Sequence, residues 1–365
     1  MSPNYALVLI EANQLNMVNA VKINIEYFLQ NQGNIPLIDV RSPAEYKHAH
    51  IPGALNLPLF DNEERAIVGT LYKKSGKETA GLKGLEIVGP KMVAFVKEAR
   101  KLAPTKRLYI HCWRGGMRSE SMAWLFETSG INSLIIEGGY KAYRQYIKKA
   151  FANEASFIIL GGMTGSGKTA ILNKLKLLGE QVIDLEGIAK HKGSAFGGIN
   201  QDQQPSTEQF ENNLYKEWRK FDLNKPIWLE DESKSIGRVQ IPDEIFLRMR
   251  QSRVIEIKMP KTQRIAILEK DYTRLDPEEL IQSTLRISKR LGGLKTRESI
   301  EAIKNNNFNL AIDIVLDYYD KSYMKGLNSR EPQTLFPINI EEIDPEVNAK
   351  IIQNFARVHT TNLKK

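Results

Sequence analysis

The sequence predicts two consecutive α/β domains, each built on a parallel sheet, with a helical region at the end of the second domain. Short apolar segments alternate with helical patterns along residues 1–152 and again along residues 153–365, and such alternation favours parallel sheets covered by helices. The length of 365 residues also suits two domains. After about residue 260 the apolar segments give way to charged helical patterns, so we expect mainly helices there.

Seven short apolar segments predict the strands, and they lie at 36–40, 107–111, 133–137, 156–160, 181–185, 226–230 and 253–259. We expect Ser119 to cap the helix after the second of these strands and Gly130 to end that helix. A helix through 138–152 leads out of the first domain. Residues 277–291 and 309–323 carry the periodicity of further helices.

Composition narrows the class of protein. The hydrophobic content of 42% and the charged content of 26% are ordinary for a globular chain. A net charge of +9 and a pI near 9.3 indicate a polyanionic partner. The single cysteine excludes an internal disulfide and points to a reducing, cytoplasmic compartment. No window of 18 unbroken apolar residues occurs, so we expect no membrane span.

The segment HCWRGGMRSE places the only cysteine, Cys112, between a predicted strand and a predicted helix. Backbone N–H groups of such a loop, together with the positive end of the helix, favour a thiolate and hold an anion against the sulfur. Arg114 and Arg118 would add charge and paired hydrogen bonds to an oxyanion. Trp113 can stack on an unpaired base. The alternatives are a buried structural cysteine and a tryptophan in the core.

The segment GGMTGSGKTA follows an apolar strand directly and contains the Walker A pattern G-x4-G-K-T. Its glycines let the backbone wrap phosphate oxygens, while the lysine contacts the outer phosphates and the threonine holds Mg²⁺. The predicted diphosphate-binding residues are Gly162, Gly165, Ser166, Gly167, Lys168 and Thr169. A nucleotide and any other diphosphate ester present the same two phosphates, so the loop alone does not choose between them.

The apolar segment at 226–230 runs into consecutive carboxylates in IWLEDES. A P-loop fold places a magnesium-holding carboxylate at this point, so Glu230 and Asp231 are the candidate magnesium-linked residues. No metal site made of protein ligands alone is predicted. A solvated acidic turn is the alternative.

The segment LIDVRSPAEYKHAHIPGALNLPLF resembles the signature of rhodanese domains, which place a cysteine loop at the end of a central strand. The loop HCWRGGMRS also fits the His-Cys-x5-Arg-Ser pattern of cysteine-dependent phosphatases, and it is one residue longer than the loops of simple sulfurtransferases. The wider loop suits a phosphate-sized anion, including a thio- or selenophosphate. His50 matches a motif position that is usually structural in rhodaneses, so we give it no catalytic role.

With DLEGIAKHKGSAFG and LEDESKSIG in the second half, the chain resembles tRNA 2-selenouridine synthases over nearly its whole length. One departure is Lys192, where we expect the family to carry arginine in His-Arg-Gly-Ser. The resemblance implies that selenium replaces the sulfur of wobble 2-thiouridine through an S-geranyl intermediate. Geranyl diphosphate and selenophosphate would be the substrates, Mg²⁺ a candidate cofactor, and tRNA and the selenophosphate-producing enzyme the partners.

The resemblance also assigns roles. Cys112 would be catalytic, and the selenophosphate-binding residues would be Arg114, Gly115, Gly116 and Arg118. His191 is a candidate contact to a phosphate or the base, and Phe196 is a candidate wall for the geranyl group; a structural histidine and a flexible glycine loop are the alternatives. The basic runs 248–264 and 286–297 suit tRNA phosphates, although a solvated charged face explains each equally well.

Three other functions compete at this point. A sulfurtransferase fused to a P-loop kinase or ATPase would form thiocyanate from thiosulfate and turn over nucleotide without tRNA. A cysteine phosphatase would hydrolyse an aryl phosphate. A non-catalytic, nucleotide-dependent RNA-binding protein would keep its function after Cys112→Ala. The combined motifs favour the tRNA-modifying enzyme.

Overall fold

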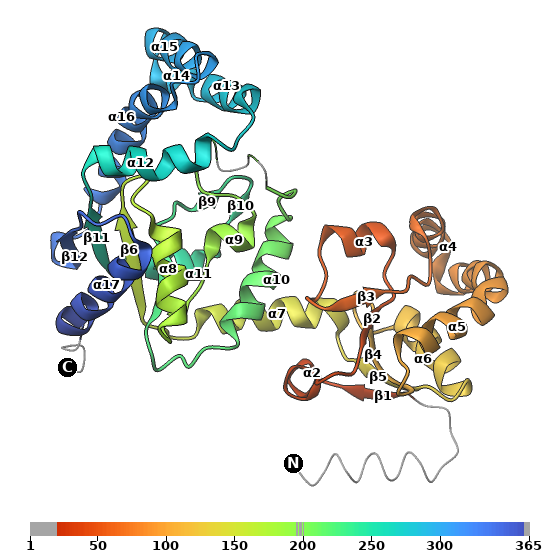
Figure 1. Cartoon of the computed structure of the whole chain (residues 1–365). Coiled ribbons are helices and arrows are strands. Elements are labelled where there is room, and N and C mark those ends of the chain that lie inside the picture. Colours follow the sequence, from red (N-terminus) through yellow and green to blue (C-terminus); the bar gives the residue numbers. More distant parts are fainter. Residues whose placement is uncertain (1–19, 195, 197–198, 200, 361–365) are drawn as a thin grey trace. The chain divides into compact units, whose positions relative to one another are not determined.

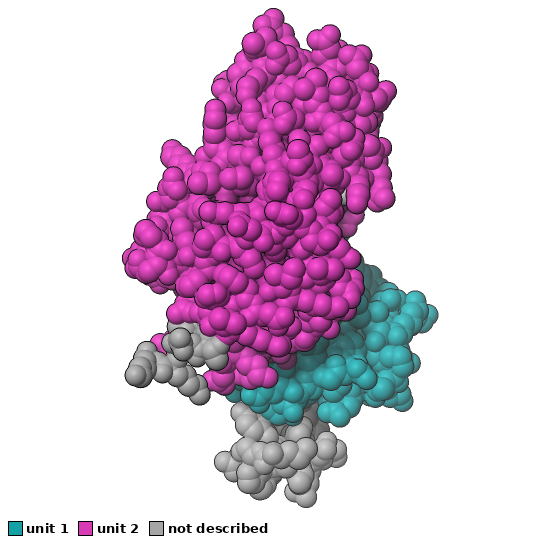
Figure 2. All heavy atoms as spheres, turned by 60° about the vertical axis from the view of Figure 1, so that its left-hand side comes forward, with its two compact units in different colours: residues 1–150 teal, residues 151–365 magenta. Residues whose placement is uncertain are grey.

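The computed structural model describes residues 20–194, 196, 199 and 201–360 (Figure 1). The chain divides into two compact units, residues 1–150 and 151–365, which Figure 2 colours separately. The division falls near the end of helix α7 (Gly139–Ala152). Among the described residues, no helix is both long and apolar enough to cross a membrane.

The first unit contains a five-stranded sheet in which every pair is parallel, in the order β1-β5-β4-β2-β3. Its strands are β1 (Val21–Ile23), β2 (Leu37–Asp39), β3 (Ala54–Asn56), β4 (Arg107–His111) and β5 (Asn132–Ile136). Strand β4 is central and almost entirely buried, as expected for a parallel strand with helices on both faces. The loop that follows β4 therefore leaves the middle of the sheet.

The helices of the first unit are α2 (Ile25–Asn31), α3 (Pro43–His48), α4 (Asn62–Val88), α5 (Met92–Leu102), α6 (Met117–Thr128) and α7. Helix α3 begins with a capping box, in which the Ser42 hydroxyl accepts from the Glu45 N–H and the Glu45 carboxylate accepts from the Ser42 N–H. Helix α4 bends at Gly76, where φ is 86°.

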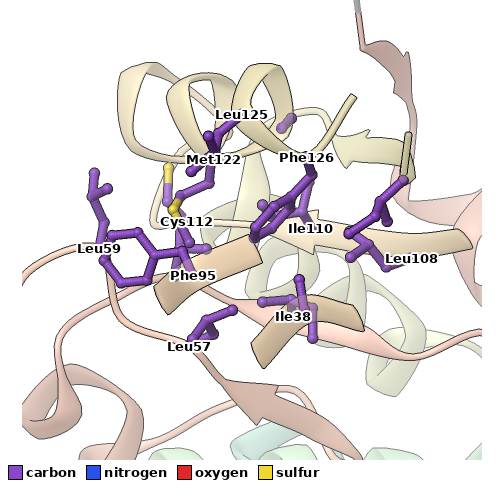
Figure 3. Close-up of a cluster of buried hydrophobic side chains, with 14 of the residues drawn as sticks. Ile38, Leu57, Leu59, Phe95, Leu108, Ile110, Cys112, Met122, Leu125 and Phe126 are labelled. Carbon is purple, nitrogen blue, oxygen red and sulfur yellow. The ribbon is translucent and has the colours of Figure 1, made fainter. Parts of the chain in front are cut away.

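Apolar side chains from β2, β4, α5 and α6 form the core on one side of this sheet. Figure 3 shows Cys112 at one edge of that core, beside Leu59, Phe95 and Met122. Only 4% of the Cys112 surface is exposed. The packing of the core therefore fixes where the sulfur lies.

The second unit contains another five-stranded parallel sheet, in the order β12-β11-β6-β8-β7. Its strands are β6 (Phe157–Gly162), β7 (Gln181–Val182), β8 (Ile227–Glu230), β11 (Arg253–Lys258) and β12 (Leu335–Asn339). Strands β9 (Ser235–Ile236) and β10 (Val239–Gln240) form a separate antiparallel pair. Strand β6 is central and fully buried, so its glycine-rich end emerges from the middle of the sheet.

Helices pack around this second sheet and extend beyond it. They are α8 (Lys168–Leu177), α9 (Leu185–Ala189), α10 (Thr207–Trp218), α11 (Asp243–Gln251), α12 (Lys261–Tyr272), α13 (Pro277–Arg286), α14 (Ser288–Leu291), α15 (Gly293–Lys304), α16 (Phe308–Leu327) and α17 (Pro345–Thr360). Helices α12 to α16 share an apolar cluster of their own. We call these five helices the helical body; Figure 1 shows α13, α14 and α15 together around one end of α16.

The predicted fold class of two parallel α/β domains with C-terminal helices is confirmed. Three details of the prediction are wrong. Ser119 does not cap α6, because the helix begins at Met117 and Ser119 lies inside its first turn. The segment 181–185 is a strand only over its first two residues, since Asp184 caps α9. Strand β12 lies in the region expected to be helical.

Candidate functional site

The cysteine loop joins β4 to α6 and spans Cys112–Gly116. The Cys112 sulfur lies 3.3 Å from the Ser119 hydroxyl oxygen and 3.9 Å from the Gly116 carbonyl oxygen. The Cys112 carbonyl accepts a hydrogen bond from the Tyr140 N–H at 2.9 Å. The loop is thus held from both sides, by the first turn of α6 and by the first turn of α7.

Gly115 lies where no other residue fits. Its φ is +67°, and a Cβ atom there would lie 2.5 Å from the Ile136 carbonyl oxygen and 3.0 Å from the Gly138 nitrogen. Gly139 packs equally closely against the cysteine loop, since a Cβ atom on Gly139 would lie 2.4 Å from the Cys112 carbonyl oxygen. The pair Gly138–Gly139 was not predicted from the sequence, although two glycines directly after an apolar strand are a visible signal.

Gly115→Ala is therefore expected to destabilise the first unit by about 2–4 kcal/mol, because a left-handed residue gains a Cβ that overlaps backbone atoms. Thermal unfolding of the full chain measures this effect. Gly116→Ala is the matched control, since the Gly116 φ is −104° and nothing lies within 4 Å of its added Cβ. Equal loss of stability in the two variants would contradict the tight packing at Gly115.

The two arginines of the cysteine loop differ in their surroundings. Arg114 is exposed. Arg118 donates to both carboxylate oxygens of Glu45, at 2.7 and 3.4 Å. Burial raises the pKa of Glu45, but the hydrogen bonds and charge of Arg118, together with the Ser42 N–H and the charge of Arg65, lower the pKa below its usual value. An anion at the loop thus competes with Glu45 for Arg118.

The residues on either side of Cys112 in the sequence, His111 and Trp113, differ in burial. Trp113 is 38% exposed, with its ring 5.6 Å from that of Tyr140. His111 is fully buried, and its Nδ1 lies 3.1 Å from the Cys112 carbonyl oxygen. Burial lowers the pKa of His111, although nearby Asp39 opposes the change. His111 is thus a neutral support for the loop, and Trp113 presents an aromatic face beside it.

We call residues 162–169 the phosphate loop; it runs from the last residue of β6 to the first two residues of α8. It contains all six residues predicted to bind a diphosphate. Gly162, Gly165 and Gly167 have φ angles of 147°, 86° and 74°. The Lys168 ammonium donates to the Gly162 carbonyl at 2.7 Å. Ser166 is 1% exposed, and its hydroxyl has no hydrogen-bond partner among the described residues. The loop thus places a cation and a free hydroxyl at the end of the central strand.

Side chains of the helical body hold this loop. The Tyr323 hydroxyl of α16 accepts from the Gly162 N–H at 2.8 Å. Arg264 of α12 donates to the Thr164 carbonyl at 3.0 Å and pairs with Asp320 of α16 at 2.7 and 2.8 Å. None of these partners was predicted, since 56 to 161 positions separate the members of each pair along the chain.

Two carboxylates, those of Glu186 and Glu232, interact with residues of the phosphate loop. The Thr169 hydroxyl donates to Glu186 Oε2 at 3.0 Å. A Cβ on Gly193 would lie 2.8 Å from Glu232 Oε1 and 2.9 Å from Glu186 Oε1, so the two carboxylates converge on one point. Both residues stand in the segments DLEGIAKHKG and LEDES that the sequence singles out, but neither was predicted as a site residue.

Of the two carboxylates predicted to be magnesium-linked, Asp231 forms ion pairs with Arg330 and Arg250. Glu230 is 1% exposed and accepts from the Leu185 N–H at 3.3 Å. Burial raises the pKa of Glu230 well above its usual value, and nearby acidic side chains add to the rise. Asp231 is thus already paired with two cations, and Glu230 is a buried carboxyl group whose surroundings favour the neutral form.

The oxygens that suit Mg²⁺ at this loop are the Thr169 hydroxyl and the Glu186 and Glu232 carboxylates, since Mg²⁺ prefers hard oxygen donors and substrate phosphates. Among the residues that the structure describes, no group of three or more His, Cys, Asp or Glu is arranged to hold a metal ion. A magnesium ion here would therefore depend on the phosphates of a bound substrate.

The Glu186–Glu232 pair makes the stability of the second unit dependent on pH. Burial, with the negative charge of Glu186, raises the pKa of Glu232 from 4.5 to about 8. A carboxyl group with a raised pKa binds its proton more tightly in the folded chain, so the free energy of unfolding falls as pH rises from about 4.5 to about 8.

Glu232→Gln is expected to remove this dependence and to stabilise the second unit by about 1–3 kcal/mol at pH 8, with little effect near pH 5. Thermal unfolding at several pH values measures the difference. Glu301→Gln, at an exposed position on α15, is the control. A constant difference between Glu232→Gln and wild type across this pH range would contradict the raised pKa.

The two remaining residues predicted to contact the substrate, His191 and Phe196, lie in different surroundings. His191 donates its backbone N–H to the Glu186 carbonyl at 3.1 Å, which places it beside the phosphate loop. Its buried Nδ1 has no partner among the described residues, and burial lowers its pKa. Phe196 is buried in the apolar cluster of the helical body, 5.4 Å from the Tyr272 ring.

Comparison with known proteins matches each unit to a family model. Residues 26–146 match the rhodanese-like domain, and residues 155–353 match the tRNA 2-selenouridine synthase AAA domain. A tRNA 2-selenouridine synthase of Bdellovibrio bacteriovorus is 37% identical, over 84% of this chain and 92% of that protein. Those of Nitrosomonas europaea and Shewanella piezotolerans are 33% and 34% identical, over 82% and 88% of this chain and 91% and 96% of theirs. The chain belongs to the tRNA 2-selenouridine synthase family.

Proposed function

We propose that this enzyme replaces the sulfur of a wobble 2-thiouridine in tRNA by selenium in two steps, one at each loop. Family membership supports the overall exchange. The observation that supports the division into steps is that two separate loops, each with glycines and cationic side chains that suit an anion, follow the central strands of the two parallel sheets. Both donors are phosphate-bearing anions, so each step has a loop of its own.

The first step is transfer of a geranyl group at the phosphate loop. The sulfur of 2-thiouridine attacks C1 of geranyl diphosphate, a C–S bond forms, and the C–O bond breaks with its electron pair leaving on the diphosphate. The N3 proton of the base is lost. The Lys168 ammonium and the loop N–H groups stabilise the departing charge. Thr169 and Glu186 would hold a Mg²⁺ ion, which would supply further neutralisation of the diphosphate charge.

The second step is entry of selenium at the cysteine loop. Selenium of selenophosphate attacks C2 of the geranylated base, the C–S bond breaks, and the departing sulfur takes the proton of the Cys112 thiol and leaves as geranylthiol. Water then cleaves the P–Se bond and releases phosphate. Arg114 and the loop backbone hold the selenophosphate against Cys112, and Arg118 joins them when it leaves Glu45. The enzyme that makes selenophosphate supplies this donor.

Nucleoside mass spectrometry on 2-thiouridine tRNA tests the proposal. The tRNA is incubated with the protein, geranyl diphosphate and selenophosphate, and each donor is omitted in turn. We expect a geranylated nucleoside with the diphosphate alone, and selenouridine once selenophosphate is added. Unchanged tRNA with folded protein would contradict the proposal.

A further inference from the structure

We propose that exposed cations at the junction of α13, α14 and α15 bind the phosphate backbone of the tRNA; this surface rests on the proposed function. Residues 285–297 run through the junction and contain no Asp or Glu. Their cations are Arg286, Lys289, Arg290, Lys295 and Arg297. A run of cations without acids is the electrostatic signature of a phosphate-binding surface.

Three of these cations are available to a partner. Arg286, Lys289 and Arg297 are exposed and have no ion-pair partner within the described part of the chain. Lys295 is already paired with Asp317 at 2.7 Å, and Arg290 donates to the Tyr318 hydroxyl at 3.2 Å. We call Arg286, Lys289 and Arg297 the basic edge.

In the other basic run, 248–264, every cation except Lys258 makes contacts inside the protein. Arg264 is 3% exposed and paired with Asp320, and Lys261 is paired with Asp313 and Asp317. Arg248, Arg250 and Arg253 donate to backbone carbonyls, those of Phe151, Gly326 and His359 in turn. Among the described residues, the run 248–264 thus keeps one exposed cation without an ion pair, Lys258, whereas the run 286–297 keeps three and contains no acid.

Helix α16 links the basic edge to the phosphate loop. Tyr318 of α16 accepts from Arg290, beside the basic edge, while Tyr323 of the same helix contacts Gly162. The two tyrosines are five positions apart in the helix, which corresponds to a rise of about 7.5 Å along its axis. A tRNA backbone held on the basic edge would thus lie on helices that share an apolar cluster with α16, the helix that contacts the phosphate loop.

The test compares two triple variants of the full chain by fluorescence anisotropy with labelled 2-thiouridine tRNA at several salt concentrations. One variant carries Arg286→Gln, Lys289→Gln and Arg297→Gln. The control carries Lys176→Gln, Lys216→Gln and Lys258→Gln, which remove the same charge at exposed positions on α8, α10 and β11 of the same unit. Thermal unfolding checks that both remain folded.

Loss of three phosphate contacts is expected to weaken tRNA binding about 100-fold at 0.1 M salt and to lower the slope of log K against log salt by about 2–3. The control variant is expected to bind like wild type. At saturating tRNA the basic-edge variant should keep the wild-type kcat for geranyl transfer, with the change appearing in KM.

Two results would overturn the surface alone: a basic-edge variant that binds as tightly as wild type, or equal weakening in both variants. In either case wild-type protein would still make selenouridine, so the proposed function would stand. Wild-type protein that neither binds nor modifies tRNA would overturn the proposed function, and the surface with it.

Discussion

Replacing Lys168 by alanine is expected to lower the rate of geranyl transfer about 100- to 1,000-fold. The Lys168 ammonium lies within the phosphate loop, where it donates to the Gly162 carbonyl. In the proposed first step its charge is the main cationic contribution of the protein to the departing diphosphate, and removing one such preorganised donor has an effect of this size. The rate is measured by mass spectrometry of the geranylated nucleoside.

Lys176→Ala is the matched control, because Lys176 lies on the same helix α8 and is exposed. It is expected to keep wild-type activity. The Lys168 variant should still convert tRNA that is already geranylated, since that step needs only the cysteine loop. A Lys168 variant with normal geranyl transfer would show that the phosphate loop does not hold the diphosphate.

The second large effect is expected for Cys112→Ser, which should block selenium entry and leave geranyl transfer near the wild-type rate. The sulfur is buried among apolar side chains beside the cysteine loop (Figure 3). Serine fills the same position, but its hydroxyl is a much weaker acid than a thiol and does not protonate the departing sulfur, so we expect the fold to be kept and selenium entry to be lost. Incubation with both donors should therefore accumulate the geranylated nucleoside.

Thermal unfolding and tRNA binding of the Cys112→Ser protein provide the controls for this result. A folded variant that binds tRNA but fails to geranylate it would overturn the separation of the two steps. A variant that forms selenouridine at the normal rate would remove Cys112 from the reaction.

The fold and both loops could be predicted because their signals are local. Strand β4 and Cys112 are adjacent in sequence, as are strand β6 and the glycines of the phosphate loop. Periodicity and turn residues report such neighbours directly. Strands β1, β3 and β12 escaped prediction because each is short or lies at an edge of its sheet, where the apolar pattern is weak.

The partners of the site residues could not be predicted, because they come from distant parts of the chain. Asp231 follows a buried strand, as a magnesium ligand would, but Arg330 neutralises it from 99 positions away. Arg118 belongs to the cysteine loop, yet Glu45 of α3 holds it. In both cases the sequence identifies the charged residue, and only the fold identifies its counterion.

The most direct test of the two-step scheme uses the geranylated tRNA made by one variant as the substrate of the other variant. Geranylated tRNA made by the Cys112→Ser protein is purified and incubated with the Lys168→Ala protein and selenophosphate, without geranyl diphosphate. Formation of 2-selenouridine, detected by nucleoside mass spectrometry, is the expected result, because each variant keeps the loop that the other lacks. Geranylated tRNA that stays unchanged, while wild-type protein converts it, would contradict two independently acting loops.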